Sequence, residues 1–251
     1  WENILGEVRM DGQMRKVVMH MHRGGFLYVL DRATGKLLSA QPYAKVNWAT
    51  HVDLATGSPV ESQVSKELRA GKTVELFPGI LGAKNWPHAS FNPNTGLLYA
   101  TTNTVSSTYR FLKLQEYKPG LRYQGIENIS SPITPDTIAS HLEAIDPLTG
   151  KAKWRTPVKG QQLSAAMLTT GGGLLFTGRP TGEFIAVDVG NGQELWSFKT
   201  GSGIHAQPIT WTRNGKQYVT VLSGTGGVAG ARRGLPDVPL GGSVWTFALI
   251  D

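Results

Sequence analysis

The sequence predicts an all-β protein, a β-propeller with four four-stranded blades of which the last is incomplete. Two observations carry this prediction. First, the 251 residues include 31 glycines and 14 prolines among short runs of Val, Leu, Ile, Phe, Tyr and Thr, a composition typical of many strands joined by many turns. Second, one turn motif recurs along the chain, and the segments around it align as units of about 40 residues. A chain of this length can also bury a substantial core.

The recurring motif is Asp/Asn-x-x-Thr/Asn-Gly. It occupies residues 31–35, 53–57, 92–96, 146–150 and 188–192. An initial Asp or Asn and a final Gly suit a type I turn closed by a left-handed residue, a common hairpin connection. Each copy therefore predicts a hairpin corner with a structural role.

The strands around these corners group into four units. They are predicted at about residues 4–40, 88–157, 164–200 and 205–251, with long insertions at 41–80 and 103–140. The last unit lacks its final corner and its fourth strand. Such sheets bury both faces only by stacking around an axis, which predicts propeller blades. The alternative is a β-sandwich, which gives no reason for corners to recur at blade spacing.

Composition excludes several functions. The chain has no cysteine, which excludes disulfides, thiolate metal sites and cysteine nucleophiles. Its net charge is +7, but Lys and Arg are scattered, so we expect no nucleic-acid partner. No apolar run reaches the roughly 18 residues of a membrane span. The opening WENILGEVRM has neither a start methionine nor a signal segment, so we expect a processed chain or a fragment.

Two corners extend into a longer pattern, Ala-x-Asp-x-x-Thr/Asn-Gly-x-x-x-Trp, which ends at Trp154 and at Trp196. This pattern resembles the tryptophan-docking motif of the quinoprotein alcohol dehydrogenases, whose eight-bladed propellers hold pyrroloquinoline quinone (PQQ). The segments RKVVMHMHRGGFLYVLDRATGKLLSA, GAKNWPHASFNPNTGLLYA and GSGIHAQPITWTRNGKQYVTVLSGTGG are similar to the methanol and ethanol dehydrogenases of that family. Their order matches the C-terminal half, which implies blades five to eight. A tryptophan on an outer strand can cover the next sheet.

The resemblance also implies which residues bind the cofactor. Arg23 matches a basic residue that hydrogen-bonds the reactive quinone oxygens, and a planar guanidinium can bridge two adjacent oxygens. Asn85 matches an asparagine that contacts the same oxygens, and an amide donates without adding charge. Trp86 matches an aromatic position beside the cofactor in some members; the alternative is a core aromatic under a loop. Val228 corresponds to a position near the cofactor rim.

The same resemblance places the remaining chemistry elsewhere. It implies that Ca²⁺ or a lanthanide ion is bound by residues outside this chain, and that the catalytic Asp lies upstream. We therefore expect neither a catalytic residue nor a metal ligand here, and no activity without the missing N-terminal half of the propeller. The implied reaction is periplasmic oxidation of a primary alcohol to an aldehyde by hydride transfer to PQQ, with electrons passed to a cytochrome c.

Two other interpretations remain open. His20 and His22 lie on one face of a predicted strand at a spacing that a metal could use, but no further ligand lies nearby, which favours ordinary packing. The alternative function is a non-catalytic PQQ-like propeller scaffold for protein–protein interaction in the bacterial envelope. The long insertions and the segment KNWPHASFNP favour the enzyme.

Overall fold

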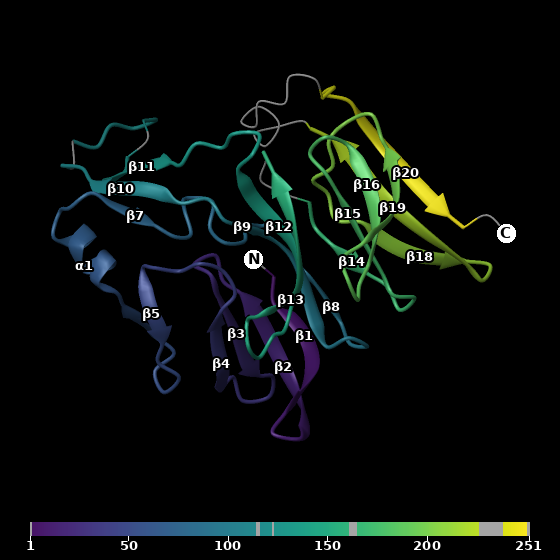
Figure 1. Ribbon diagram of the computed structural model, residues 1–251, viewed down its shortest axis with the longest axis horizontal. Helices are drawn as coiled ribbons and strands as arrows, with labels where there is room; N and C mark the ends of the chain where they lie inside the picture. Colours follow the sequence, from purple (N-terminus) through teal and green to yellow (C-terminus); the bar gives the residue numbers. More distant parts are fainter. Residues whose placement is uncertain (1, 114–115, 122, 161–164, 226–237, 250–251) are drawn as a thin grey trace.

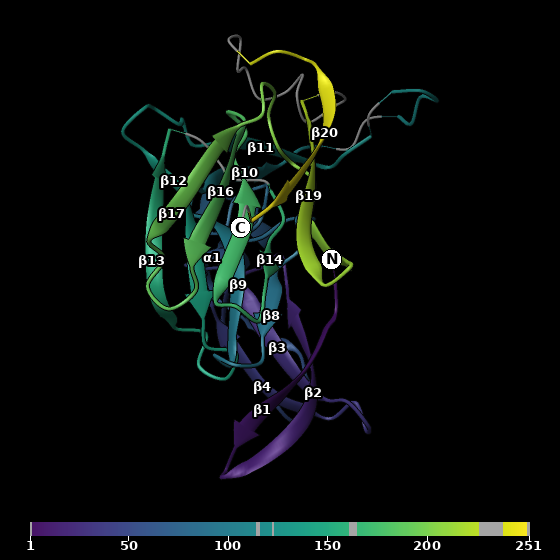
Figure 2. The same ribbon diagram turned by 90° about the vertical axis from the view of Figure 1, so that its right-hand side faces the viewer.

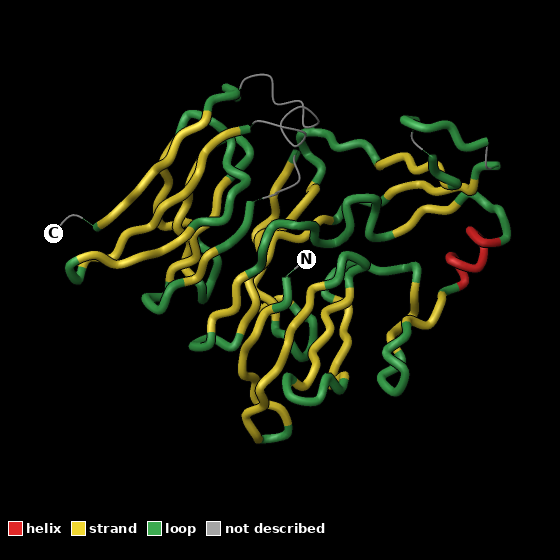
Figure 3. Tube along the Cα trace, turned by 180° about the vertical axis from the view of Figure 1, so that it is seen from behind, coloured by secondary structure: helices red, strands yellow, loops and turns green. Residues whose placement is uncertain are grey.

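The predicted all-β fold is confirmed by a computed structural model, which describes residues 2–113, 116–121, 123–160, 165–225 and 238–249. Strands dominate these residues, and the short helix α1 (Gln63–Arg69) lies at one end of the molecule (Figure 3). No helix in the described ranges is long and apolar enough to cross a membrane.

Four antiparallel sheets follow one another, each with its strands in chain order. The first has β1 (Ile4–Met10), β2 (Gln13–Met21), β3 (Phe26–Asp31) and β4 (Leu37–Pro42). The second has β8 (Ser90–Asn92), β9 (Leu97–Asn103), β12 (Ile138–Ile145) and β13 (Ala152–Lys159). The third has β14 (Leu168–Thr169), β15 (Leu174–Gly178), β16 (Glu183–Asp188) and β17 (Glu194–Lys199). The fourth has β18 (Ile209–Arg213), β19 (Lys216–Gly224) and β20 (Gly242–Ala248), so within the described residues it is one strand short, as predicted.

The sheets pack side by side in a curved row (Figures 1 and 2). The first strands of the first three sheets are neighbours, since β8 contacts both β1 and β14. This is the arrangement of propeller blades around an axis. The eight-bladed ring itself remains a prediction.

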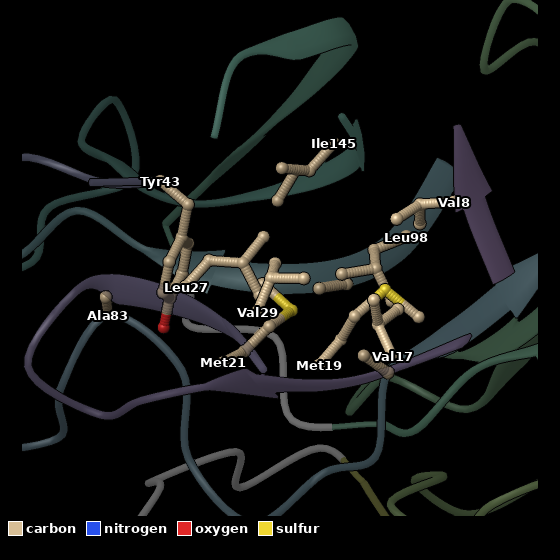
Figure 4. Close-up of a cluster of buried hydrophobic side chains, with 12 residues drawn as sticks. Val8, Val17, Met19, Met21, Leu27, Val29, Tyr43, Ala83, Leu98 and Ile145 are labelled. Atoms are coloured by element: carbon tan, nitrogen blue, oxygen red, sulfur yellow. The ribbon is translucent and has the colours of Figure 1, made fainter. Parts of the chain in front are cut away.

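Apolar side chains fill the spaces between successive sheets. Between the first and second sheets, Met19, Leu27 and Val29 meet Leu98 and Ile145, and all five are fully buried (Figure 4). A second cluster joins the second and third sheets. Its buried members are Tyr99, Leu142, Ala144, Met167, Leu175, Ile185, Val187 and Val189. The second sheet thus contributes apolar residues to both of its neighbours, which explains why the units repeat.

The five predicted corners are confirmed as hairpin turns. At the fourth, the Asp146 carboxylate accepts hydrogen bonds from the backbone N–H groups of Leu148 (2.8 Å) and Thr149 (3.2 Å). The Asp146 carbonyl accepts a bond from Gly150 N–H (2.9 Å). All five closing glycines have φ between 69° and 77°, the left-handed region that favours glycine. The corner at 53–57 belongs to an insertion, where it joins β5 (Ala49–Val52) to β6 (Pro59–Glu61).

The tryptophans dock one sheet on the next, as the motif predicts. Trp154 Nε1 donates to the Val189 carbonyl (2.8 Å). A Cβ on Gly192 would lie 2.6 Å from the Trp154 ring, so the glycine lets the indole approach. In the first sheet the equivalent position is Ser39, whose hydroxyl donates to the Leu148 carbonyl (3.2 Å).

The two insertions meet in a separate three-stranded sheet. Its order is β11-β10-β7, with β7 (Val74–Leu76) from the first insertion and β10 (Ser107–Phe111) and β11 (Ile126–Ser130) from the second. Figure 1 shows this sheet beside α1, away from the sheet of β18, β19 and β20. This pairing was not predicted from the sequence.

Candidate cofactor site

Arg23 lies in the tight turn between β2 and β3, and the backbone of this turn is held on several sides. Its three successive carbonyl groups each accept a hydrogen bond. Tyr43 OH donates to the His22 carbonyl (2.9 Å), and Ala83 N–H donates to the Arg23 carbonyl (2.9 Å). Trp48 Nε1 donates to the Gly24 carbonyl (2.8 Å). Side chains on such a turn start from a fixed backbone position, which is what a binding group requires.

The segment 82–85 lies directly against Arg23. Gly82 has φ of 76°, and a Cβ there would lie 2.1 Å from Arg23 Cγ. Asn103, at the end of β9, holds the segment in place. Its backbone N–H donates to the Ala83 carbonyl (2.6 Å) and its side-chain amide donates to the Gly82 carbonyl (3.0 Å). The structure therefore brings together two of the predicted site regions that lie far apart in sequence.

Asn85 follows on the same segment. Its Nδ2 donates to the Leu81 carbonyl (2.8 Å), and its Oδ1 accepts from Trp86 N–H (2.9 Å). A primary amide carries two N–H groups, so these bonds fix the side chain and still leave one N–H for a ligand.

Trp86 is 49% exposed, so its indole is not part of the core of the described residues. A half-exposed indole on a fixed segment can cover a flat ligand. Val228, the fourth predicted residue, lies outside the described residues.

A buried ion pair, not predicted from the sequence, supports this segment. Lys84 is 1% exposed, and its Nζ lies 2.9 Å from Glu2 Oε1 and 3.2 Å from the Asn85 carbonyl. Burial lowers the pKa of Lys84, against the opposing charge of Glu2. Burial alone would raise the pKa of Glu2, but the N–H of Ala89 and the charge of Lys84 lower it overall. No local sequence pattern links residues 82 positions apart.

His20 and His22 lie next to the turn, with ring centroids 6.2 Å apart. His22 Nδ1 accepts from Gly24 N–H (3.1 Å), while burial, then the charges of His20 and Arg23, lower the pKa of His22. A neutral His22 therefore serves as an acceptor that supports the turn. Across the described ranges, His, Asp and Glu residues form no group of three that could hold a metal ion.

Comparison with known proteins places this geometry in a family. Residues 157–219 match the family described as "Glucose/ethanol/alcohol dehydrogenase, beta-propeller domain". A quinoprotein ethanol dehydrogenase of Pseudomonas putida is 39% identical over 95% of this chain, and a lanthanide-dependent methanol dehydrogenase of Methylorubrum extorquens is 40% identical over all of it. This chain belongs to the quinoprotein alcohol dehydrogenase family. It spans 40% and 43% of the lengths of these two relatives.

Solved structures of quinoprotein dehydrogenases share the fold. A europium-containing methanol dehydrogenase superimposes with a TM-score of 0.84 at 32% identity, covering 99% of this chain and 47% of that one. The quinohemoprotein alcohol dehydrogenase of Comamonas testosteroni gives a TM-score of 0.85 at 32% identity, covering 98% of this chain and 37% of that one.

The donor groups of this quinoprotein chain fit a planar quinone. A guanidinium and an amide N–H suit adjacent carbonyl oxygens, and an exposed indole suits the flat ring system. The junction between the third and fourth sheets provides an internal comparison. There Ile204 N–H donates to the Arg179 carbonyl (3.0 Å), as Ala83 does to Arg23. The Arg179 side chain pairs with Glu194 (2.6 Å).

The residues that follow also differ between the two junctions. Pro87 and Pro208 occupy equivalent positions after the shared backbone bond. Aligned on these prolines, Asn85 and Trp86 correspond to Ala206 and Gln207. Only the first of these two junctions therefore combines an arginine, an asparagine and a tryptophan. The two junctions share a backbone hydrogen bond but present different side chains.

Proposed function

We propose that this chain holds the reactive edge of PQQ in an enzyme that oxidises primary alcohols to aldehydes. The observation that carries this proposal is the joining of the Arg23 turn to the Asn85 segment through the hydrogen bond from Ala83 N–H to the Arg23 carbonyl. When bound, PQQ supplies the two-electron redox chemistry by accepting a hydride from the alcohol.

Each side chain has a role that follows from its chemistry. Arg23 would donate to adjacent quinone oxygens and counter the negative charge that develops on reduction. Asn85 would donate its remaining amide N–H to the same edge without adding charge. Trp86 would cover the ring system and exclude water from it.

The other parts of the enzyme are proposed to come from the N-terminal half of an eight-bladed ring. That half would bind Ca²⁺ or a lanthanide ion and supply the aspartate that accepts the hydroxyl proton, and electrons would leave to a cytochrome c in the periplasm. One observation supports a further blade beside the fourth sheet, because its apolar side chains are exposed. These are Ile209 (57%), Trp211 (40%), Leu222 (55%) and Val244 (67%).

Titration of PQQ into the full-length protein tests the proposal. We expect the quinone absorbance to change on binding, and Arg23→Ala to lower dye-linked alcohol oxidation by about 100-fold, as loss of one charge-stabilising donor does. Arg9→Ala is the matched control, because Arg9 lies in the exposed β1–β2 hairpin and bonds Gly12. If PQQ absorbance stays unchanged, or both variants behave alike, the proposal is wrong.

A further inference from the structure

A basic groove lies between the outer strands of the first and second sheets, outside the candidate cofactor site. It has a volume of about 630 Å³ and runs between the segment after β4 and the strand β13. Its charged lining residues are all cationic: Lys45, Lys151, Lys153 and Arg155. The fold thus brings Lys45 beside three cations that are close together in the sequence.

The alternation of β13 explains this gathering. Its odd-numbered residues are exposed, while the even-numbered residues are partly buried toward the third sheet, where Trp154 bonds Val189. Lys151, which directly precedes β13, and Lys153 and Arg155 within it are all exposed, alternate with less exposed residues and line the groove. The pairing of β13 with β12 shifts by one residue at Lys153. Lys45 lines the same groove from the segment that follows β4.

These charges are weakly compensated. Among the described residues, no carboxylate lies within ion-pair distance of Lys45, Lys151 or Lys153. Arg155 bonds the Glu143 carboxylate (2.9 Å), yet its side chain remains 47% exposed. Lys45 Nζ lies 3.6 Å from the centroid of the Phe77 ring, a contact that orients the ammonium and leaves its charge in place.

We propose that this groove binds an extended acidic segment of a partner protein, with carboxylates at alternate positions. Alternate side chains of an extended peptide lie on one side of it, and the exposed cations at 151, 153 and 155 likewise alternate with less exposed residues. The proposal is independent of PQQ.

Single-stranded nucleic acid fits the groove less well. It requires exposed aromatic platforms, but Tyr43 is 2% exposed and the Trp154 indole is bonded to Val189.

Fluorescence anisotropy of a labelled eight-residue peptide, with Glu at every second position and Ser between, tests the proposal on the full-length protein. We expect the triple variant Lys45→Gln/Lys151→Gln/Lys153→Gln to weaken binding about tenfold, the combined effect of three exposed ion pairs. The control Lys36→Gln/Lys66→Gln/Lys118→Gln removes the same charge from positions elsewhere on the surface and should change the affinity less than twofold. Binding of the Glu peptide should also weaken between 50 and 200 mM salt.

Three outcomes would overturn the proposal. In the first, both triple variants weaken binding equally, which indicates net charge alone. In the second, a peptide with Gln in place of Glu binds as well. In the third, an oligo-dT strand or vesicles with anionic lipid bind and lose affinity in the groove variant, while the Glu peptide does not bind. Circular dichroism and the Tm of each variant establish that it is folded.

Discussion

Gly82 shows how one residue controls the candidate site. Its φ of 76° and its contact with Arg23 Cγ exclude any side chain. Asn103 fixes the carbonyl of the same residue (3.0 Å), so the Arg23 turn and the Asn85 segment are held at a set distance. Small local changes should therefore alter cofactor binding more than they alter the fold.

We expect Gly82→Ala to weaken PQQ binding at least tenfold, because the new methyl group must displace the Arg23 side chain or backbone. Gly12→Ala is the matched control. Gly12 also has a positive φ (77°), but nothing lies within 4 Å of its Cβ position. Both variants should lose about 1 kcal/mol of stability through backbone strain. Equal PQQ affinities for the two variants would contradict this role.

Glu143 should make the stability of the fold depend on pH. Its side chain is 1% exposed and its carboxylate bonds Thr102 (2.7 Å) and Arg155 (2.9 Å). Burial raises its pKa above the ordinary 4.5, against the lowering effects of Thr102 and Arg155. The folded state therefore binds more protons than the unfolded state as the pH rises from 4.5 to this raised pKa, so this group's contribution to stability falls over that window.

Glu143→Gln should remove this contribution. We expect the free energy of unfolding of the variant, relative to the wild type, to rise between about pH 4.5 and 7, as measured by urea denaturation. Glu7→Gln, at an exposed position of β1, is the control for the loss of one carboxylate. A parallel pH dependence for Glu143→Gln and the wild type would contradict a raised pKa at Glu143.

Among the structural elements, the hairpin corners and the outer strands make the contacts between neighbouring sheets. The corners and the docking tryptophans were predictable from the sequence because each depends on a few neighbouring residues with fixed backbone preferences. The β11-β10-β7 sheet, the Glu2–Lys84 pair and the basic groove were not, because each joins segments distant in sequence. For the site, Arg23 and Asn85 followed from a family resemblance, while their joining through Ala83 required the fold.

Trp154→Ala should lower the free energy of unfolding by about 3–5 kcal/mol, because it removes a large interblade side chain. Trp86→Ala is the matched control. Trp86 is 49% exposed, so we expect its loss to change stability by less than about 1 kcal/mol while it weakens PQQ binding. Urea denaturation of both variants measures the difference, and equal losses would contradict the docking role.

At the scale of the whole molecule, the fourth sheet presents an apolar face. Leu222 and Val244 are cross-strand partners on β19 and β20, and both are exposed (55% and 67%). If the proposed N-terminal half covers this face, a charge placed there should destabilise the full-length protein. The same charge should make the 251-residue chain alone less prone to associate with itself.

We expect Leu222→Lys/Val244→Lys to lower the Tm of the full-length protein, because buried charges lack partners. The same change should reduce self-association of the 251-residue chain expressed alone, as followed by light scattering, because it breaks an apolar patch. Leu121→Lys, at a 67% exposed position in an insertion, should have neither effect. An unchanged Tm in the full-length double variant would argue that this face stays uncovered.

A crystal structure of the full-length protein with PQQ would show whether the Arg23 turn and the Asn85 segment hold the cofactor. We expect the Arg23 guanidinium and the Asn85 Nδ2 to lie within about 3.2 Å of the reactive quinone oxygens, with Trp86 beside the rings. A quinone bound elsewhere, or one whose reactive oxygens face neither Arg23 nor Asn85, would contradict it.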